Sequence, residues 1–362
     1  FEKLIREGYF YQDRTDLIPI IENWSSNYPI FLRPRRFGKS LFISTLHYYY
    51  GLENRAKFSA IFKDLYIGQN PTPLANSYLV LKLEFSRIDT KTHESTYSGF
   101  LRNVKYGVNV FMNAYSNFFT NEQREQIDTL TAPEDVVKTL FEYMTINEVP
   151  HKIYLLVDEY DHFANELLSF DLARFKTSVS RNGFVRKFYE SFKTATGDGI
   201  IDRIFITGVS PITMDSLTSG FNISDNISLN PIFHDLMGFT HAETKEILRK
   251  ADIETEKIAN MMADLAKWYD GYQFARVNKG SLFNPDMLFY FLKEYGILNK
   301  YPDEMLDTNV VSDYRKIRNM FNIGGEEDIR LGILDELTKI GYVDFSLTRL
   351  FNLEAPFTDD DF

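Results

Sequence analysis

The segment from Arg33 to Ser40 has the composition of a phosphate-binding loop. It reads R-P-R-R-F-G-K-S and fits the P-loop pattern G-x-x-x-x-G-K-[S/T], except that Arg33 replaces the first glycine. Gly38 would let the backbone approach a phosphate closely, and the N–H groups that begin the next helix would donate to it. Lys39 would reach the β- and γ-phosphates, and the Ser40 hydroxyl would bind Mg²⁺.

This loop predicts a site for a nucleotide, with ATP as the default of the class and Mg²⁺ as its metal. The arginines of the loop add positive charge, and guanidinium forks fit phosphate oxygens. The alternative is that G-K-S occurs here by chance and that the arginines form a solvated surface. The residues predicted to bind the nucleotide are Pro34, Arg35, Arg36, Phe37, Gly38, Lys39, Ser40 and Leu41, and Lys39 is also predicted to act in catalysis.

A pair of acids follows a second informative strand. The apolar run of residues 153–157 ends in Asp158 and Glu159, which is the Walker B arrangement. Asp158 would hold the Mg²⁺ shell, and Glu159 would act as general base on the attacking water. Thr207, at the end of the next apolar run, would sense the γ-phosphate. The alternatives are that strands often end in acids at loops, and that Thr207 is simply a strand-forming residue.

The elements that would position these residues alternate along the first part of the chain. Apolar runs predict strands at residues 28–32, 78–85, 153–157 and 203–208, with a short edge strand at 227–229. Helices are expected at 40–50, through much of 95–148 and, from the capping box Thr240–Glu243, up to Lys250. In the second of these, residues 131–134 resemble a helix start with a Thr131 cap. Further helices are expected at 255–270, 284–295, 309–321 and 326–340.

This order predicts an α/β fold with a parallel sheet and helices on both faces, followed by a mostly helical region. The expected domains are residues 1–235 for the P-loop part and 236–362 for the helical part. In such sheets ligands bind at the carboxyl ends of the strands. The fold would therefore bring Lys39 and Asp158 to one edge.

Composition excludes several classes of function. The chain has 362 residues, no cysteine, and a net charge of −11 from 40 basic and 51 acidic residues. Disulfides, thiolate zinc sites and cysteine nucleophiles are thereby excluded, and a general nucleic-acid coat is disfavoured. No apolar run approaches the ~20 residues of a membrane-spanning helix. We expect a cytoplasmic protein without membrane contact, and a fragment of a longer chain.

Several other residues are candidates for the same chemistry. The segment from Tyr9 to Thr15 would support the nucleotide base, or would pack its aromatic rings against the sheet. An arginine that stabilises phosphoryl charge in cis or in trans is expected in such a reaction. The candidates are Arg35, Arg36, Arg181 and Arg203.

With these motifs in place, the sequence resembles the AAA-ATPase-like family of bacterial ATP-binding proteins. The resemblance spans nearly the whole chain and is carried by residues 33–40, 153–161 and 205–209, and by S-G-F-N at 219–222. Residues 11–15 are similar to the family's Y-x-D-K-T, with Arg14 in the lysine place. W-Y-D-G-Y at 268–272 and F-N-P at 283–285 are similar to the family's helical region.

The resemblance implies an ASCE-type P-loop domain followed by a helical, winged-helix-like region. In this family arginine at position 33 is usual, so the resemblance implies that the missing glycine is no degeneration of this chain. It also implies that relatives commonly continue into a nuclease-like domain of the PD-(D/E)xK type, which is missing here. Lys82–Glu84 lacks the required E-x-K order, so we expect no nuclease activity in this chain.

Three functions remain in competition. The first is an ATPase, and the second is a slow or non-hydrolysing nucleotide switch that regulates a protein partner or nuclease module. The third is a DNA-binding component built on residues 326–353. Direct nucleic-acid binding is disfavoured, because acidic residues outnumber basic ones in that segment.

Overall fold

The structure, a computed structural model, describes residues 1–179, 183–211, 223–275, 277, 279–307, 332, 335, 336 and 338–340. The described chain forms two compact units. Unit 1 is built from residues 1–77 and 225–307, and unit 2 mainly from residues 78–211. From the sequence, one domain is expected before residue 235 and another after it, whereas unit 1 contains residues from both sides of that position. The expected domain boundary stays a prediction.

In the sequence of unit 1, one buried strand is followed by a loop and then by a helix. Strand β1 (Pro29–Leu32) is buried along its length and is followed, after the loop, by helix α3 (Lys39–Tyr50). β1 pairs in parallel with β5 (Asp225–Asn226). The short helices of this unit are α1 (Glu2–Arg6), α2 (Ile18–Glu22), α4 (Phe58–Phe62) and α5 (Tyr66–Gln69), with 3-10 turns at Thr15–Leu17, Leu52–Lys57 and Pro231–Phe233.

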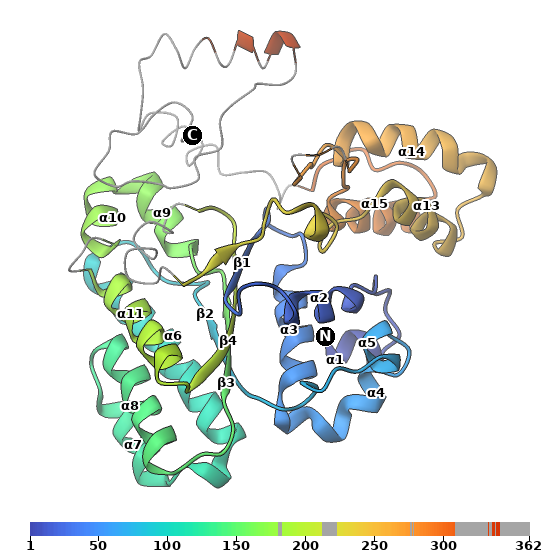
Figure 1. The fold of residues 1–362 in the computed structure, drawn as a ribbon. Helices are drawn as coiled ribbons and strands as arrows, with labels where there is room; N and C mark the ends of the chain where they lie inside the picture. The colour runs from blue at the N-terminus through green and yellow to red at the C-terminus, as the bar shows by residue number, and fades with distance from the viewer. Residues whose placement is uncertain are drawn as a thin grey trace. The chain divides into compact units, whose positions relative to one another are not determined.

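The second half of unit 1 is helical (Figure 1). It contains α13 (His241–Lys250), α14 (Thr255–Tyr269) and α15 (Pro285–Leu298). Each of these helices contributes apolar side chains to one core, among them Leu248, Leu265 and Leu288. The capping box predicted at Thr240 and Glu243 is present, with both reciprocal hydrogen bonds, so α13 begins where its sequence signal places it.

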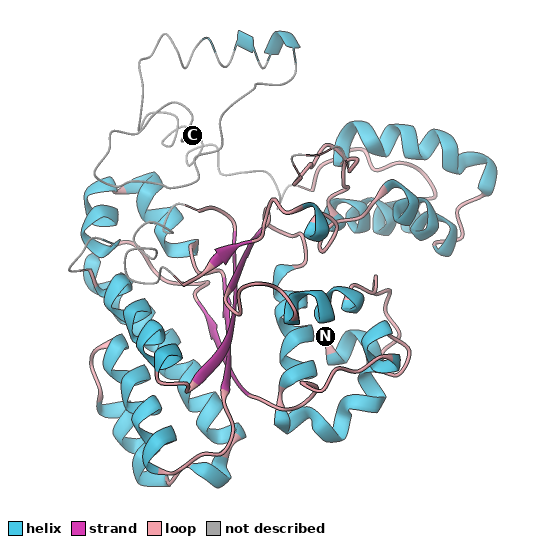
Figure 2. Ribbon diagram, in the orientation of Figure 1, coloured by secondary structure: helices cyan, strands magenta, loops and turns pink. Residues whose placement is uncertain are grey.

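Unit 2 is a parallel sheet with helices (Figure 2). Its strands β2 (Leu79–Glu84), β3 (Ile153–Asp158) and β4 (Ile201–Gly208) pair in that order, and all are parallel. Between them lie α6 (His93–Ala114), α7 (Asn121–Thr129), α8 (Pro133–Ile146), a 3-10 turn at Ser116–Phe118, α9 (His162–Phe170), α10 (Leu172–Val179) and α11 (Phe184–Gly197).

Strand β3 is the centre of unit 2. Every one of its residues is buried, because β2 and β4 flank it and helices cover it, as its apolar sequence predicts. Residue pairing sets Glu84 of β2 opposite Asp158 of β3. The α/β fold class with parallel strands is therefore confirmed, as is the helical character of residues 241–298. The expected helix at 309–321 lies outside the described residues, as does most of the expected winged helix.

Two local expectations are wrong. Helix α8 begins at Pro133 with Ala132 as its N-cap, and Thr131 gives it no cap. The fixed φ of proline suits the first helical position, which makes Thr131 one residue too early. The edge strand lies at residues 225–226 rather than 227–229. It ends there because the Asn226 side chain accepts the backbone N–H and the hydroxyl of Ser228, which turns the chain.

Among the described residues, no helix combines the length and the apolar character that crossing a membrane requires.

Gly208 ends β4 where no side chain fits. A Cβ there would lie 2.4 Å from the Tyr160 ring and 2.6 Å from Asp161 Oδ1. We expect Gly208→Ala to lower the free energy of unfolding by about 1–3 kcal/mol, because the overpacked neighbours must move. Gly197→Ala is the matched control, since its Cβ would meet nothing within 4 Å. Urea unfolding of the two variants measures the difference, and equal stability would contradict the packing argument.

Candidate nucleotide-binding site

The loop between β1 and α3 has the backbone of an anion-binding turn. Gly38 is the N-cap of α3 and adopts φ +94°, a left-handed conformation that favours glycine. Arg36 is also left-handed, with φ +66°. The first helical bond runs from Phe42 N to Gly38 O. The earlier N–H groups of α3 therefore have no helical acceptor and can donate to a phosphate.

Arg33 occupies the position of the first P-loop glycine and is almost completely buried. Its guanidinium donates to the carbonyls of Ser228, Phe233 and His234, as well as to that of its neighbour Leu32. It also lies 4.0 Å from the ring centres of Phe31 and Phe274. Burial lowers the pKa of Arg33 to about 9, although Asp235 opposes this. The expectation that Arg33 offers charge to phosphate is therefore wrong; it fastens the loop to the segment after β5.

Lys39 lies within the curve of the loop. It is buried, and its Nζ donates to the carbonyls of Arg33, at 2.9 Å, and Pro34, at 2.8 Å. The ammonium group is thus held by the carbonyls of the first two residues of the turn. Ser40 is exposed in the first turn of α3. The arrangement places a cation and a hydroxyl beside the helix N-terminus, as the sequence predicts.

Two further loop residues contact the helical half of unit 1. Arg36 donates to Asp286 at 2.6 Å, at the start of α15, and is 3.5 Å from Asp307. Phe37 is buried and packs edge-on against Tyr272, with ring centres 4.8 Å apart, and against Phe274. These two residues therefore attach the loop to residues 272–307, a role that the pattern alone does not show.

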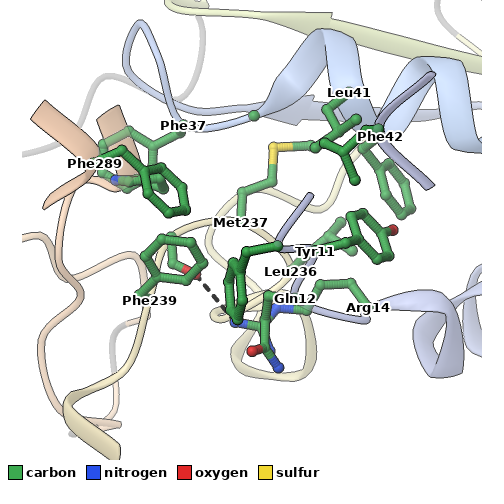
Figure 3. A pocket seen from close by; sticks show the side chains of 15 residues that line it. Tyr11, Gln12, Arg14, Phe37, Leu41, Phe42, Leu236, Met237, Phe239 and Phe289 are labelled. Carbon is green, nitrogen blue, oxygen red and sulfur yellow. Dashed lines mark hydrogen bonds between the residues drawn. The ribbon is translucent and has the colours of Figure 1, made fainter. Parts of the chain in front are cut away.

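A cavity of about 140 Å³ begins at the end of this loop (Figure 3). It is mostly apolar. Its lining comes from the N-terminal segment, the loop, α3, the chain before α13 and the start of α15. It includes Phe10, Tyr11, Phe37, Gly38, Leu41, Phe42, Met237, Gly238, Phe239 and Phe289. An engineered apolar cavity of about 150 Å³ holds a benzene ring. The cavity therefore has about the volume that holds a single benzene ring, and Gly38 of the loop is part of its lining.

The acid pair and Thr207 lie in unit 2. Asp158 is buried, and its Oδ1 accepts a hydrogen bond of 2.7 Å from the Thr207 hydroxyl. Thr207 thus holds the carboxylate in one orientation. Asp161 is also buried; it accepts from the backbone N–H groups of Val209 and Ser210 and fixes the loop after β4.

Glu159 follows β3 with a left-handed backbone, φ +52°. A non-glycine residue in this region carries strain, which is common at functional positions. The side chain is about one third exposed and lies 3.7 Å from His162 Nδ1. The backbone therefore leaves the extended conformation directly after Asp158, the last residue of β3.

The predicted residues fall into two groups. Residues 34–38 form the turn and residues 39–41 the start of α3 in unit 1, and Asp158 lies beside Thr207 in unit 2. That the two halves share one Mg²⁺ stays a prediction. Of the candidate arginines, Arg35 is exposed, Arg36 is paired with Asp286, Arg203 lies near Asp202, and Arg181 is outside the described residues.

Sequence reasoning missed the ion pair of Glu243 with Arg14, a residue that lines the cavity. Burial opposes the charged forms of both groups. The pairing outweighs it, so the pKa of Arg14 is raised and that of Glu243 is lowered. The only sequence signal was the Glu243 capping box, which does not reveal a partner far away in the chain.

A family model described as Predicted AAA-ATPase matches residues 1–218, more than half of the chain. The chain belongs to this family. The matched range contains both the phosphate loop and the acid pair of this family member.

Two individual proteins are similar to the chain. An uncharacterised protein encoded in the vnfD 5′ region of Azotobacter chroococcum mcd 1 is 25% identical over 297 residues, which cover 80% of this chain and 50% of the relative. The chain thus spans about half the length of that relative. The solved structure of a Walker-type ATPase of Pyrococcus abyssi is 14% identical and covers 90% of this chain and 74% of its own, with a TM-score of 0.41. We draw no argument from so distant a likeness.

The role of Arg33 can be tested by restoring the glycine of the P-loop pattern. We expect Arg33→Gly to lower the free energy of unfolding by about 3 kcal/mol or more, because each buried carbonyl left unpaired costs about 1–3 kcal/mol. Arg35→Gly, in the same loop but exposed, is the control and should cost less than ~1 kcal/mol. Denaturant unfolding compares them, and an Arg33→Gly protein as stable as wild type would refute this role.

Proposed function

We propose that this chain binds ATP together with Mg²⁺ and hydrolyses it. The observation that carries the proposal is the turn between β1 and α3. It combines the left-handed Gly38, the start of a 12-residue helix and the inward-held Lys39. These are the parts that a triphosphate requires: backbone donors, a helix N-terminus and a cation at close range.

The cavity beside the loop is the proposed site for the base of the nucleotide, at the opposite end from the phosphates. Its walls are mainly aromatic and aliphatic, so the flat face of a nucleobase would exchange water for apolar contacts there. Gly38 and Leu41 border both the cavity and the phosphate turn. A nucleotide with its base in the cavity has its phosphates directed to Lys39.

The residues present fit a magnesium ion. The donors are the exposed Ser40 hydroxyl and the oriented Asp158 carboxylate, both oxygen ligands of the kind that Mg²⁺ takes. Mg²⁺ commonly keeps several waters and binds through one or two carboxylates together with phosphates of the substrate. When bound, the ion would neutralise charge on the β- and γ-phosphates.

In the proposed reaction, Glu159 accepts a proton from the water that attacks the γ-phosphate in line. Lys39 and the N–H groups at the start of α3 stabilise the charge that spreads over the phosphoryl oxygens. Thr207 acts by holding Asp158 through the 2.7 Å hydrogen bond. In this scheme the sensing of the γ-phosphate by Thr207 is indirect.

A second candidate is a nucleotide switch with little turnover. The contacts of Arg36 with Asp286, and of Phe37 with Tyr272, favour it. Through them, a ligand that moves the loop also moves residues 272–307, which could change the affinity for a protein partner. Steady-state phosphate release separates the two candidates, because a switch binds ATP with almost no release.

Nucleotide binding is tested first at Lys39. We expect Lys39→Ala to weaken ATP·Mg²⁺ binding at least tenfold, because the loop loses the cation that faces the phosphates. Calorimetry measures the dissociation constant. Lys57→Ala, which removes a lysine paired with Glu2, is the control and should leave binding unchanged. Equal affinity of Lys39→Ala and wild type would refute the phosphate site.

Hydrolysis is tested at Glu159. We expect Glu159→Gln to retain ATP binding and to lose turnover by a factor on the order of 10²–10³, since the amide cannot accept the proton. Glu166→Gln, a neighbouring acid that also lies near His162, is the control. Phosphate release is the measurement. Equal rates for wild type and Glu159→Gln would defeat the assignment of the base.

A further inference from the structure

The pair formed by Arg14 and Glu243 joins two distant parts of unit 1 at the wall of the cavity. Arg14 donates to both carboxylate oxygens of Glu243, one of them at 2.8 Å, and to the Gly238 carbonyl at 3.1 Å (dashed in Figure 3). The two side chains are only 14% and 18% exposed. Such a partly desolvated, two-point pair is more rigid than a surface ion pair.

Both partners of the pair are themselves fixed. Glu243 also accepts from Thr240 N and Thr240 Oγ1, at the start of α13. Next to Arg14, Asp13 accepts from Thr15 and, through its other oxygen, from Tyr66 N. Arg14 therefore connects a braced N-terminal segment to the first turn of a helix.

Gly238 connects this pair to the phosphate loop. It is left-handed, with φ +98°, and a Cβ there would lie 3.1 Å from the Phe37 ring and 3.2 Å from Leu282. Its backbone therefore rests against Phe37 while Arg14 holds its carbonyl. Arg14, Gly238 and Phe37 all line the cavity.

We propose that Arg14 and Glu243 are positioning residues that hold the Gly238 wall of the cavity in place, and thereby set the affinity for the base of a nucleotide rather than for its phosphates. The inference rests on the proposed nucleotide site. Neither residue needs to contact the phosphates of the ligand. The pair acts on the base through Gly238, whose position it fixes. If Gly238 is no longer held in place, the base loses apolar contacts in the cavity, while the turn at Gly38 and Lys39 keeps its structure.

The test compares ligands with and without a base. The dissociation constants of ATP·Mg²⁺, ADP·Mg²⁺ and tripolyphosphate·Mg²⁺ are measured by calorimetry for wild type, Arg14→Met and Glu243→Gln. We expect both variants to bind ATP and ADP about tenfold more weakly and to bind tripolyphosphate within twofold of wild type. The double variant should lose no more than either single variant, because the two residues act as one unit.

The matched control is a second Arg–Glu pair, which lies within α13, the helix that contains Glu243. Arg249 and Glu246 are exposed, 3.3 Å apart and not part of the cavity lining. Arg249→Met and Glu246→Gln should bind all three ligands as wild type does. If Arg14→Met does not fold, Glu243→Gln carries the test, since glutamine has the shape of glutamate. Arg14→Lys, which keeps the charge but not the fork, should give an intermediate loss.

Two results would overturn the inference. Equal losses for ATP and tripolyphosphate would show that the pair only stabilises unit 1, and unchanged ATP affinity in both variants would show that the wall does not depend on it. Failure of the proposed function looks different, because wild-type protein would then bind neither ATP nor tripolyphosphate.

Discussion

The buried guanidinium of Arg33 is the interaction on which the rest of unit 1 depends. A charged group taken out of water must find hydrogen-bond acceptors, and Arg33 finds them in carbonyls of the segment that follows β5. The same residue offers its own carbonyl to Lys39. One side chain thus fixes the base of the phosphate turn, the orientation of its lysine and the path of the chain toward the helical half.

The loop makes further contacts on other sides. Phe37 packs against Tyr272, and Arg36 pairs with Asp286. Gly238 lies against Phe37, and Arg14 donates a hydrogen bond to the Gly238 carbonyl. The phosphate turn and the neighbouring cavity are therefore parts of one packed arrangement. At the first P-loop position, the Arg33 side chain donates hydrogen bonds to the segment after β5, and glycine has no side chain that could make them.

Local patterns predicted what local physics decides. The run from 153 to 157 predicted β3, the T-H-A-E box predicted the start of α13, and G-K-S predicted a loop that leads into a helix, which is α3. The role of Arg33 could not be predicted, because its acceptor Ser228 is 195 residues away. The same is true of Arg14 and Glu243, which are separated by 229 residues. Thr131 failed as a cap because Pro133 fixed the helix start one residue later.

The order of the units along the chain has a consequence for biosynthesis. Leu32 N donates to Ser228 Oγ across 196 residues, and most of unit 2 lies between them. On a ribosome, β1 and its loop emerge long before the carbonyls that bind Arg33 are translated. The interposed parallel sheet has its strands and helices in one continuous stretch and can fold first. The turn between β1 and α3 is thus among the last parts of the nascent chain to acquire its native shape, since the contacts that fix it join residues far apart in the sequence.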